Sequence, residues 1–167
     1  AQVRDAIRDY GTAMISLDLR DRHCALIGSL SLGGVYSFFG LMSIGAVTVP
    51  LDKEMPAADL AATVTRAECS AVFYSADVAD KIEVLRAECP ALTTFVCFHG
   101  NPAGKDFSMD QLIEQGHTAF LGGNNAFYDY EIDPDRLASI VFTSGTTGNG
   151  KGVMLSQTNS VSDMTQG

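Results

Sequence analysis

Apolar residues along this chain switch between helical and strand-like spacing. Val3, Ile7, Tyr10 and Met14 fall on one helical face, so a helix is predicted from the first residues onward. Beyond it, short apolar runs rich in β-branched and aromatic residues alternate with segments of helical period. The predicted strands are 24–28, 47–49, 71–74 and 94–98, and the predicted helices are 34–43, one opened by Pro56, 78–88 and a short one at 109–115.

This alternation predicts the fold class. Repeated strand–helix–strand units require a parallel sheet with right-handed connections and helices on its faces. We therefore expect an α/β fold, a parallel sheet with βαβ crossovers, and ligand groups where loops leave the C-terminal ends of the strands. The short helix begins near Ser108, with Gln111 placed for a capping box. The polar, irregular stretch 116–134 is predicted to cross to a different edge of the sheet or to a second sheet.

Charge and hydropathy narrow the classes of partner. The chain of 167 residues has 20 Asp and Glu against 11 Lys and Arg, a net charge of −9, and its basic residues are scattered singly. We expect no nucleic-acid partner, and a polyanion would have to be held by local features. Residues 24–51 carry no formal charge, but their glycines and the β-branched residues before Pro50 break the run, so no transmembrane segment is expected.

Cysteine and histidine spacing bears on compartment and metal binding. The cysteines are far apart and form no C-x-x-C pair, which predicts reduced thiols in the core of a cytoplasmic protein. The histidines do not supply the paired short spacings of a zinc site, so no metal site is predicted from these residues. The residues concerned are Cys24, Cys69, Cys89, Cys97, His23, His99 and His117.

Candidate chemistry is concentrated in residues 139–158, SIVFTSGTTGNGKGVMLSQT. An apolar strand leads into a loop whose hydroxyls can donate to phosphate oxygens and whose glycines let backbone N–H groups approach them closely. Lys151 adds a positive charge and is the candidate catalytic residue. The predicted nucleotide-binding residues are Thr143, Ser144, Gly145, Thr146, Thr147, Gly148 and Lys151.

Two kinds of glycine-rich loop fit this segment. Residues 145–151, GTTGNGK, satisfy the P-loop NTPase spacing, but that loop needs Ser or Thr after its Lys and opens directly into a helix. Here Gly152 follows, and 152–155 is predicted to be a short strand, with helix signals only from about Ser156. A strand–loop–strand hairpin is favoured. A P-loop NTPase and a non-catalytic module that keeps the loop for structure stay open as alternatives.

The eleven residues from Thr143 to Val153 resemble the signature T-S-G-T-T-G-x-x-K-G-V of the adenylate-forming superfamily. That superfamily includes acyl-CoA synthetases, luciferases and the adenylation domains of peptide synthetases. The chain departs from many members at Gly150, where they have Pro, and at Gln157, where they have His. Residues 45–56, GAVTVPLDKEMP, are especially similar to bacterial long-chain fatty-acid–CoA ligases.

The resemblance implies an activity for a larger protein. Residues 1–167 would be part of its N-terminal AMP-binding domain, with both ends inside a longer chain and the phosphate loop at 143–153, and this piece alone is expected to be inactive. A carboxylic acid, expected to be a fatty acid, would attack Mg-ATP to give an acyl-adenylate and pyrophosphate, and the acyl group would pass to coenzyme A. ATP, Mg²⁺ and coenzyme A are thus the implied cofactors. An amino-acid adenylation domain of a peptide synthetase is the main alternative, and the oligomeric state stays open.

Overall fold

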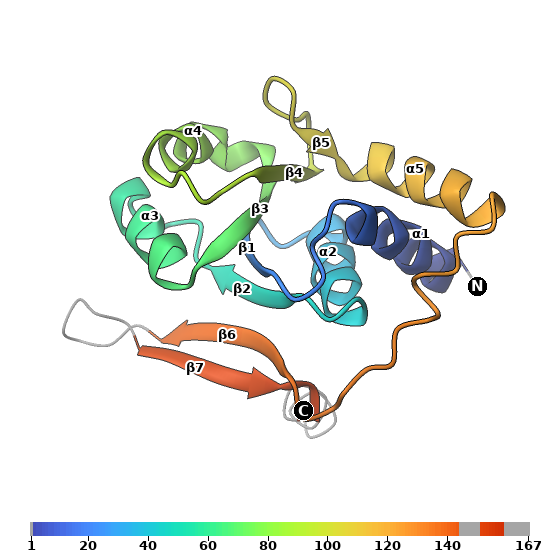
Figure 1. Cartoon of the computed structure of the whole chain (residues 1–167). Coiled ribbons are helices and arrows are strands. Elements are labelled where there is room, and N and C mark those ends of the chain that lie inside the picture. The colour runs from blue at the N-terminus through green and yellow to red at the C-terminus, as the bar shows by residue number, and fades with distance from the viewer. Residues whose placement is uncertain (1, 144–150, 159–167) are drawn as a thin grey trace.

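The computed structural model describes residues 2–143 and 151–158 (Figure 1). These residues form a seven-stranded sheet with helices on both faces. The elements are α1 (Gln2–Ser16), β1 (His23–Ile27), α2 (Leu32–Ser43), β2 (Val47–Leu51), α3 (Ala57–Arg66), β3 (Cys69–Ser75), the 3₁₀ turn η1 (Ala76–Val78), α4 (Ala79–Glu88), β4 (Thr94–His99), β5 (Phe107–Ser108), α5 (Met109–Leu121), β6 (Leu137–Thr143) and β7 (Lys151–Ser156).

The strands lie in the order β5-β4-β3-β1-β2-β6-β7. All neighbouring pairs are parallel except β6 and β7, which are antiparallel. The chain starts the sheet at β1, adds β2 on one side, and then adds β3, β4 and β5 on the other. The predicted α/β class and parallel sheet are confirmed. The two-residue strand β5 was not predicted, because two residues are too short for a periodicity to register.

The central strands bury both of their faces. In β3, Ala71 and Phe73 pack on one side of the sheet, while Val72 and Tyr74 pack on the other, and all four side chains are fully buried. The first face is covered by α1, α2 and α5, and the second by α3 and α4 (Figure 1). Such two-sided burial is typical of parallel strands and explains why these strands read as continuous apolar runs.

All four cysteines are free and buried, as predicted. Cys24 belongs to the core beneath α1 and α2, whereas Cys69, Cys89 and Cys97 belong to the core beneath α3 and α4. Burial raises the pKa of Cys24 and raises that of Cys69 to about 12, so these thiols are neutral core groups. No described helix has the length and apolar character needed to cross a bilayer.

The connector after α5 runs to the opposite edge of the sheet, as predicted, and delivers β6 beside β2. Arg20 holds it in place. The Arg20 guanidinium donates to the carbonyl of Ile44 at 3.3 Å and to that of Ala126 at 3.2 Å. It also lies over the Tyr130 ring, 4.5 Å from the centroid. One cation therefore ties the connector to the turn between α2 and β2.

The prediction that the helix after Ser108 ends at Gln115 is wrong, because α5 is longer. Its start is as expected, since Ser108 Oγ accepts a hydrogen bond from the Gln111 N–H at 3.1 Å. The helix nevertheless continues through Gly116 to Leu121. A Cβ atom at Gly116 would overlap the carbonyl group of Asp9 and lie 3.1 Å from the nitrogen of Ala13. Glycine occurs here because α1 and α5 approach closely, not because the helix ends.

The close contact of α1 and α5 predicts the effect of Gly116→Ala. In an open helix this change would stabilise the protein by up to about 1 kcal/mol, because alanine has the higher helix propensity. Overlap with α1 should instead lower the free energy of unfolding by about 1–3 kcal/mol. Urea denaturation would measure it, with the exposed neighbour Gln115→Ala as the control. A stabilised Gly116→Ala protein would refute the packing argument.

Candidate functional site

The two strands that flank the candidate loop, β6 and β7, form a β-hairpin. Strands β6 and β7 pair from Leu137 opposite Ser156 to Thr143 opposite Lys151, so the hairpin closes at the glycine-rich loop. The predicted strand–loop–strand arrangement is confirmed, with the second strand one residue longer at each end than expected. A P-loop is excluded, because its Lys would open a helix, whereas Lys151 opens β7.

The predicted site residues fall into two groups. Thr143 ends β6 and the exposed Lys151 begins β7, and their backbones face each other across the hairpin. The other predicted residues lie outside the described part of the chain: Ser144, Gly145, Thr146, Thr147 and Gly148. Of the helix expected from about Ser156, Gln157 and Thr158 are helical, and the residues after Thr158 lie outside the described part of the chain.

Gly152 has a structural reason to follow the lysine. It pairs with Phe142 across the hairpin, and a Cβ atom at this position would lie 3.3 Å from the Phe142 ring and 3.2 Å from a methyl group of Ile140. The aromatic ring of β6 thus takes the space of the missing side chain. The Arg66 guanidinium also lies over this ring, 5.0 Å from its centroid. A Walker-type Ser or Thr here would crowd this contact.

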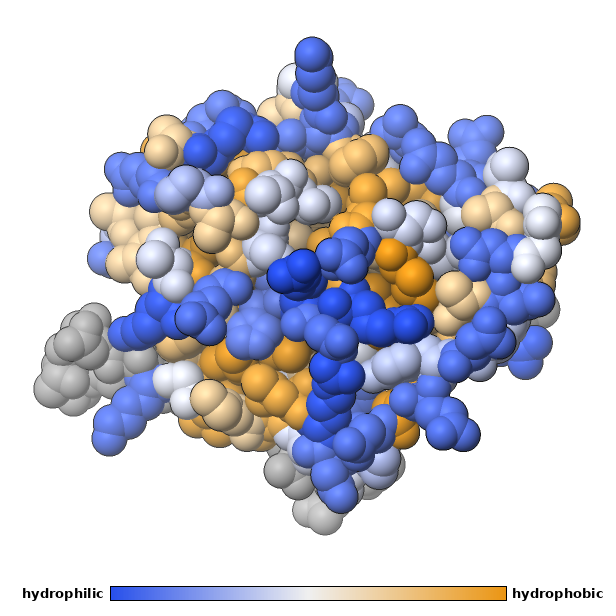
Figure 2. Space-filling view, in the orientation of Figure 1, coloured by the Kyte–Doolittle hydropathy of each residue, from blue (hydrophilic) through white to orange (hydrophobic). Residues whose placement is uncertain are grey.

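The hairpin forms one edge of the sheet. Among the described strands, β7 pairs only with β6, and its Val153 and Met154 side chains are 44% and 71% exposed. Figure 2 shows apolar surface in the area where the hairpin lies in Figure 1. The loop is thus presented from an edge hairpin whose outer strand is largely solvent-accessible.

A polar network joins the C-terminal ends of β1, β2 and β3. Asp77 accepts hydrogen bonds from Ser75 Oγ, from Ser29 Oγ at 2.7 Å and from Lys53 Nζ at 3.0 Å. Lys53 Nζ also donates to Ser29 Oγ at 2.9 Å. The hydrogen bonds from Ser75, Ser29 and Lys53 hold the pKa of Asp77 well below its usual range, and Asp77 raises the pKa of Lys53.

This network lies where ligand groups are expected in a parallel sheet, at the strand ends where the strand order reverses. Its chemistry nevertheless suits loop fixation, because the positive charge of Lys53 is already matched by Asp77 at 3.0 Å. Sequence reasoning did not single out Ser29, Ser75 or Asp77, and it quoted Lys53 only as part of the run 45–56. Each of these residues lies within four positions of the end of a predicted strand, and the strand order was needed to bring them together.

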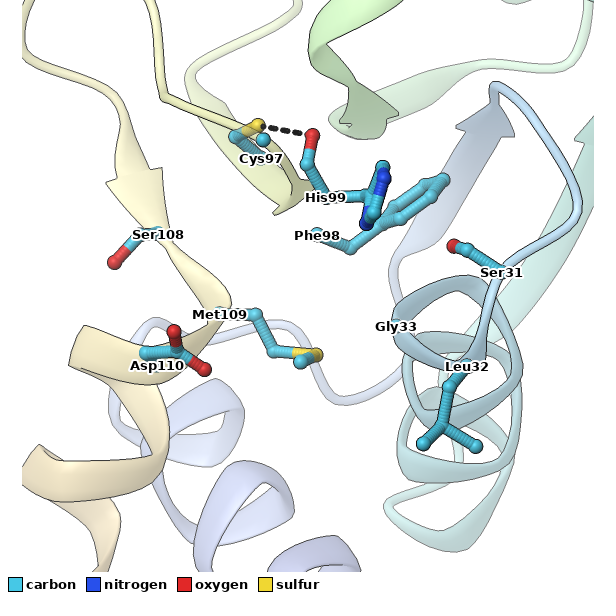
Figure 3. Close-up of a pocket in the computed structure, with 10 residues that line it drawn as sticks. Ser31, Leu32, Gly33, Cys97, Phe98, His99, Ser108, Met109 and Asp110 are labelled. Atoms are coloured by element: carbon cyan, nitrogen blue, oxygen red, sulfur yellow. Dashed lines mark hydrogen bonds between the residues drawn. The ribbon is translucent and has the colours of Figure 1, made fainter.

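Two pockets open at the same end of the sheet. One of about 330 Å³ lies between the end of β4 and the first turns of α2 and α5, and Figure 3 shows the Met109 side chain reaching across it towards α2. No Lys or Arg is among the described residues that line it, and Asp110 adds negative charge, so it does not suit a polyphosphate. The Cys97 thiol, which also lines this pocket, donates a hydrogen bond to the carbonyl of His99 at 3.2 Å, and burial raises the pKa of this thiol.

The second pocket, of about 290 Å³, lies beside it at the ends of β1 and β2. Its walls are mainly apolar, and they include Leu26, Val35, Phe38, Phe39 and Pro50. A pocket of this kind can take hydrocarbon but offers little to fix a charged group. Neither pocket therefore replaces the glycine-rich loop as the candidate for phosphate binding.

The model of the AMP-binding enzyme family matches residues 1–167. This chain belongs to the AMP-binding enzyme family. The predicted membership of the adenylate-forming superfamily is thereby confirmed. Among curated relatives, a 3-[(3aS,4S,7aS)-7a-methyl-1,5-dioxo-octahydro-1H-inden-4-yl]propanoyl:CoA ligase of Rhodococcus jostii is 24% identical over 96% of this chain and 33% of its own length. The nonribosomal peptide synthetase agiA of Aspergillus flavus is 30% identical over 82% of this chain and 2% of its own length.

The fold agrees with this family. A long-chain-fatty-acid-CoA ligase of Archaeoglobus fulgidus superposes on 99% of this AMP-binding chain with a TM-score of 0.81 at 17% identity, over 31% of its own chain. At that identity the likeness concerns the fold alone. The chain spans a third or less of the length of each of these three proteins.

Among its described residues, this AMP-binding chain has no cluster of side chains arranged to bind a metal ion. No three of its His, Cys, Asp and Glu side chains there are grouped as metal ligands would be. The carboxylate of Asp77 already accepts hydrogen bonds from the hydroxyls of Ser29 and Ser75 and from the ammonium group of Lys53.

The Asp77 network predicts a pH dependence of stability. Because the folded pKa of Asp77 is lowered, its ionised form stabilises the fold fully above the unfolded pKa of about 3.9, and this contribution is lost as the pH falls towards the folded pKa. Asp77→Asn should lower the free energy of unfolding at pH 7 by roughly 1 kcal/mol or less, since the carboxylate is partly exposed and screened.

Urea denaturation at pH 7, 5 and 3 would follow the gap between wild type and Asp77→Asn. The gap should be the same at pH 7 and 5 and should narrow at pH 3. Glu114→Gln removes the same charge from an exposed position on α5 and serves as the control. A gap that stays constant down to pH 3 would contradict the role of the ionised Asp77.

Proposed function

We propose that the whole protein containing this chain is an ATP-dependent acid–thiol ligase. It joins a carboxylate to the α-phosphate of ATP, releasing pyrophosphate, and then transfers the acyl group to the thiol of coenzyme A, releasing AMP. The observation that carries the proposal is the TSGTTGNGKGV segment, held on a β-hairpin in a chain of the AMP-binding enzyme family. The isolated chain, as part of an N-terminal AMP-binding domain, is proposed to be inactive.

The roles of the loop residues are electrostatic and geometric. The hydroxyls of Thr143, Ser144, Thr146 and Thr147, together with the backbone N–H groups of Gly145 and Gly148, suit the β- and γ-phosphate oxygens. Lys151 offsets the negative charge that grows on pyrophosphate as it leaves. In a chain of net charge −9, the lysine at the loop end is the local feature that favours a polyanion at this place.

Magnesium would enter with the nucleotide. Mg²⁺ is usually held by one or two carboxylates and by substrate phosphates rather than by an all-protein cage. The loop supplies hydroxyl oxygens and no carboxylate, which fits a metal brought by ATP, and we assign it no ligand from this chain.

For the carboxylic acid we propose a fatty acid. The run VPLDKEMP at 49–56 favours a fatty acid because it resembles bacterial long-chain fatty-acid–CoA ligases. The apolar pocket at the ends of β1 and β2 favours a hydrocarbon substrate as well. An amino acid is the second candidate, favoured by the 30% identity to a peptide synthetase. We also propose a cytoplasmic location, because four free, buried cysteines suit a reducing compartment.

The proposed reaction predicts carboxylate-dependent exchange between ATP and pyrophosphate. The whole protein would be assayed with short, medium and long fatty acids and with amino acids. Exchange with fatty acids alone is the expected result, and exchange with amino acids alone would transfer the assignment to a peptide-synthetase adenylation domain. Absence of exchange with every acid would overturn the proposed function.

Removal of the loop lysine tests its role in that reaction. A charged hydrogen bond contributes roughly 1.5–3 kcal/mol, so Lys151→Ala should lower the exchange rate by about ten- to a hundredfold. Lys105→Ala removes the same charge from an exposed loop between β4 and β5 and should leave the rate unchanged. An equal rate for Lys151→Ala and wild type would refute the assigned role of Lys151.

A further inference from the structure

The hairpin that ends in the phosphate loop is joined to the parallel sheet by a ladder of one pair. Strand β2 pairs with β1 over five positions, and β6 pairs with β7 over six. Between β2 and β6, however, a single pair is formed, Thr48 opposite Ser139. Pro50, two residues further along β2, has no N–H and leaves this strand with one donor fewer for its neighbours.

Two buried hydroxyls strengthen this single pair. Thr48 Oγ1 donates to the backbone carbonyl of Ala138 at 3.2 Å, and Ser139 Oγ donates to the backbone carbonyl of Thr48 at 3.1 Å. Thr48 is 0% exposed and Ser139 is 2% exposed. Each strand thus sends a side chain to the backbone of the other, where water has no access. A buried carbonyl that loses such a donor is left without compensation for its desolvation.

This junction lies on the path from the core to the loop. Ser139 is four residues before Thr143 on β6, a distance of roughly 13 Å along an extended strand. Strand β7 reaches the core mainly through β6, and a second attachment lies beyond its far end, where Gln157 Nε2 donates to the carbonyl of Met42 at 3.0 Å. The Thr48–Ser139 crossing is therefore the hydrogen-bonded link between the sheet and the hairpin that lies nearer to the loop among the described residues. Ile140 and Phe142, further along β6, are held by apolar packing and by Arg66.

We propose that Thr48 and Ser139 are positioning residues for the phosphate loop. Resting on the function proposed above, this inference states that their reciprocal hydrogen bonds set how the hairpin lies against β2, and hence where the loop meets the β- and γ-phosphates. Neither residue contacts the nucleotide. Their loss shifts the binding of ATP and pyrophosphate and leaves the carboxylate site unchanged.

The first test compares Thr48→Val and Ser139→Ala with wild type in the whole protein. Each change removes one neutral hydrogen bond and keeps nearly the same volume, so the KM for ATP should rise about two- to tenfold while the KM for the carboxylate stays the same. Thr48→Ser restores the hydroxyl and should restore the KM for ATP. Equal KM values for ATP in wild type and Thr48→Val would overturn the proposal.

Thr63→Val is the matched control for a purely structural effect. Thr63 is also a buried threonine, 7% exposed, whose Oγ1 donates to a backbone carbonyl, that of Asp59 at 2.8 Å, but this bond lies within α3. The variant should lose a similar amount of stability and keep the wild-type KM for ATP. A rise in this KM equal to that of Thr48→Val would show that lost stability alone explains the effect, and would also overturn the proposal.

The second test does not depend on catalysis. Amide hydrogen exchange of the whole protein should become faster in 137–143 and 151–156 for Thr48→Val and Ser139→Ala, with little change in β1, β3 and β4. Unchanged exchange in the hairpin, or faster exchange throughout the sheet, would overturn the positioning role. This test also separates the two hypotheses, because a wild type without any ATP–pyrophosphate exchange refutes the proposed function while hydrogen exchange still decides the positioning role.

Discussion

The requirement that β1, β2 and β3 bury both faces controls the rest of the architecture. Parallel strands need crossover connections, and here these connections are helices that cover the sheet on both sides. Once α1, α2 and α5 share one face, α1 and α5 must pass close together, which explains why Gly116 is in the middle of a helix. Because helices cover both faces of the sheet, the loops that could meet a ligand lie at the ends of the strands.

The edge of the sheet follows a different rule. An antiparallel hairpin needs no crossover helix, so β6 and β7 can turn directly through the loop and present it away from the helical layers. The hairpin forms a single ladder pair with β2, and two hydroxyl–carbonyl bonds at Thr48 and Ser139 supplement it. The loop proposed to bind phosphate is thereby attached to the sheet through a small buried polar contact, next to the apolar packing of Ile140.

Local patterns predicted most of the elements, because strands buried on both faces and amphipathic helices leave clear periodicities. They also placed the hairpin, since Gly152 and the apolar residues after it do not suit the start of a helix. The patterns failed at α5, where the residues from Gly116 onward were predicted to be irregular. Glycine has low helix propensity in any sequence, and only the carbonyl of Asp9, more than 100 positions away, shows why it is kept inside a helix.

The sequence by itself determined the fold class, the family signature at 143–153 and the residues proposed to hold phosphate, because each depends on neighbours along the chain. Only the tertiary structure decided which distant groups meet: Ser29, Lys53 and Asp77 at the strand ends, Arg20 on the connector, and Thr48 beside Ser139. These contacts join elements up to 106 positions apart. They depend on the order of strands in the sheet, and a hydroxyl or a charge carries no local mark of the partner that the folded chain will bring to it.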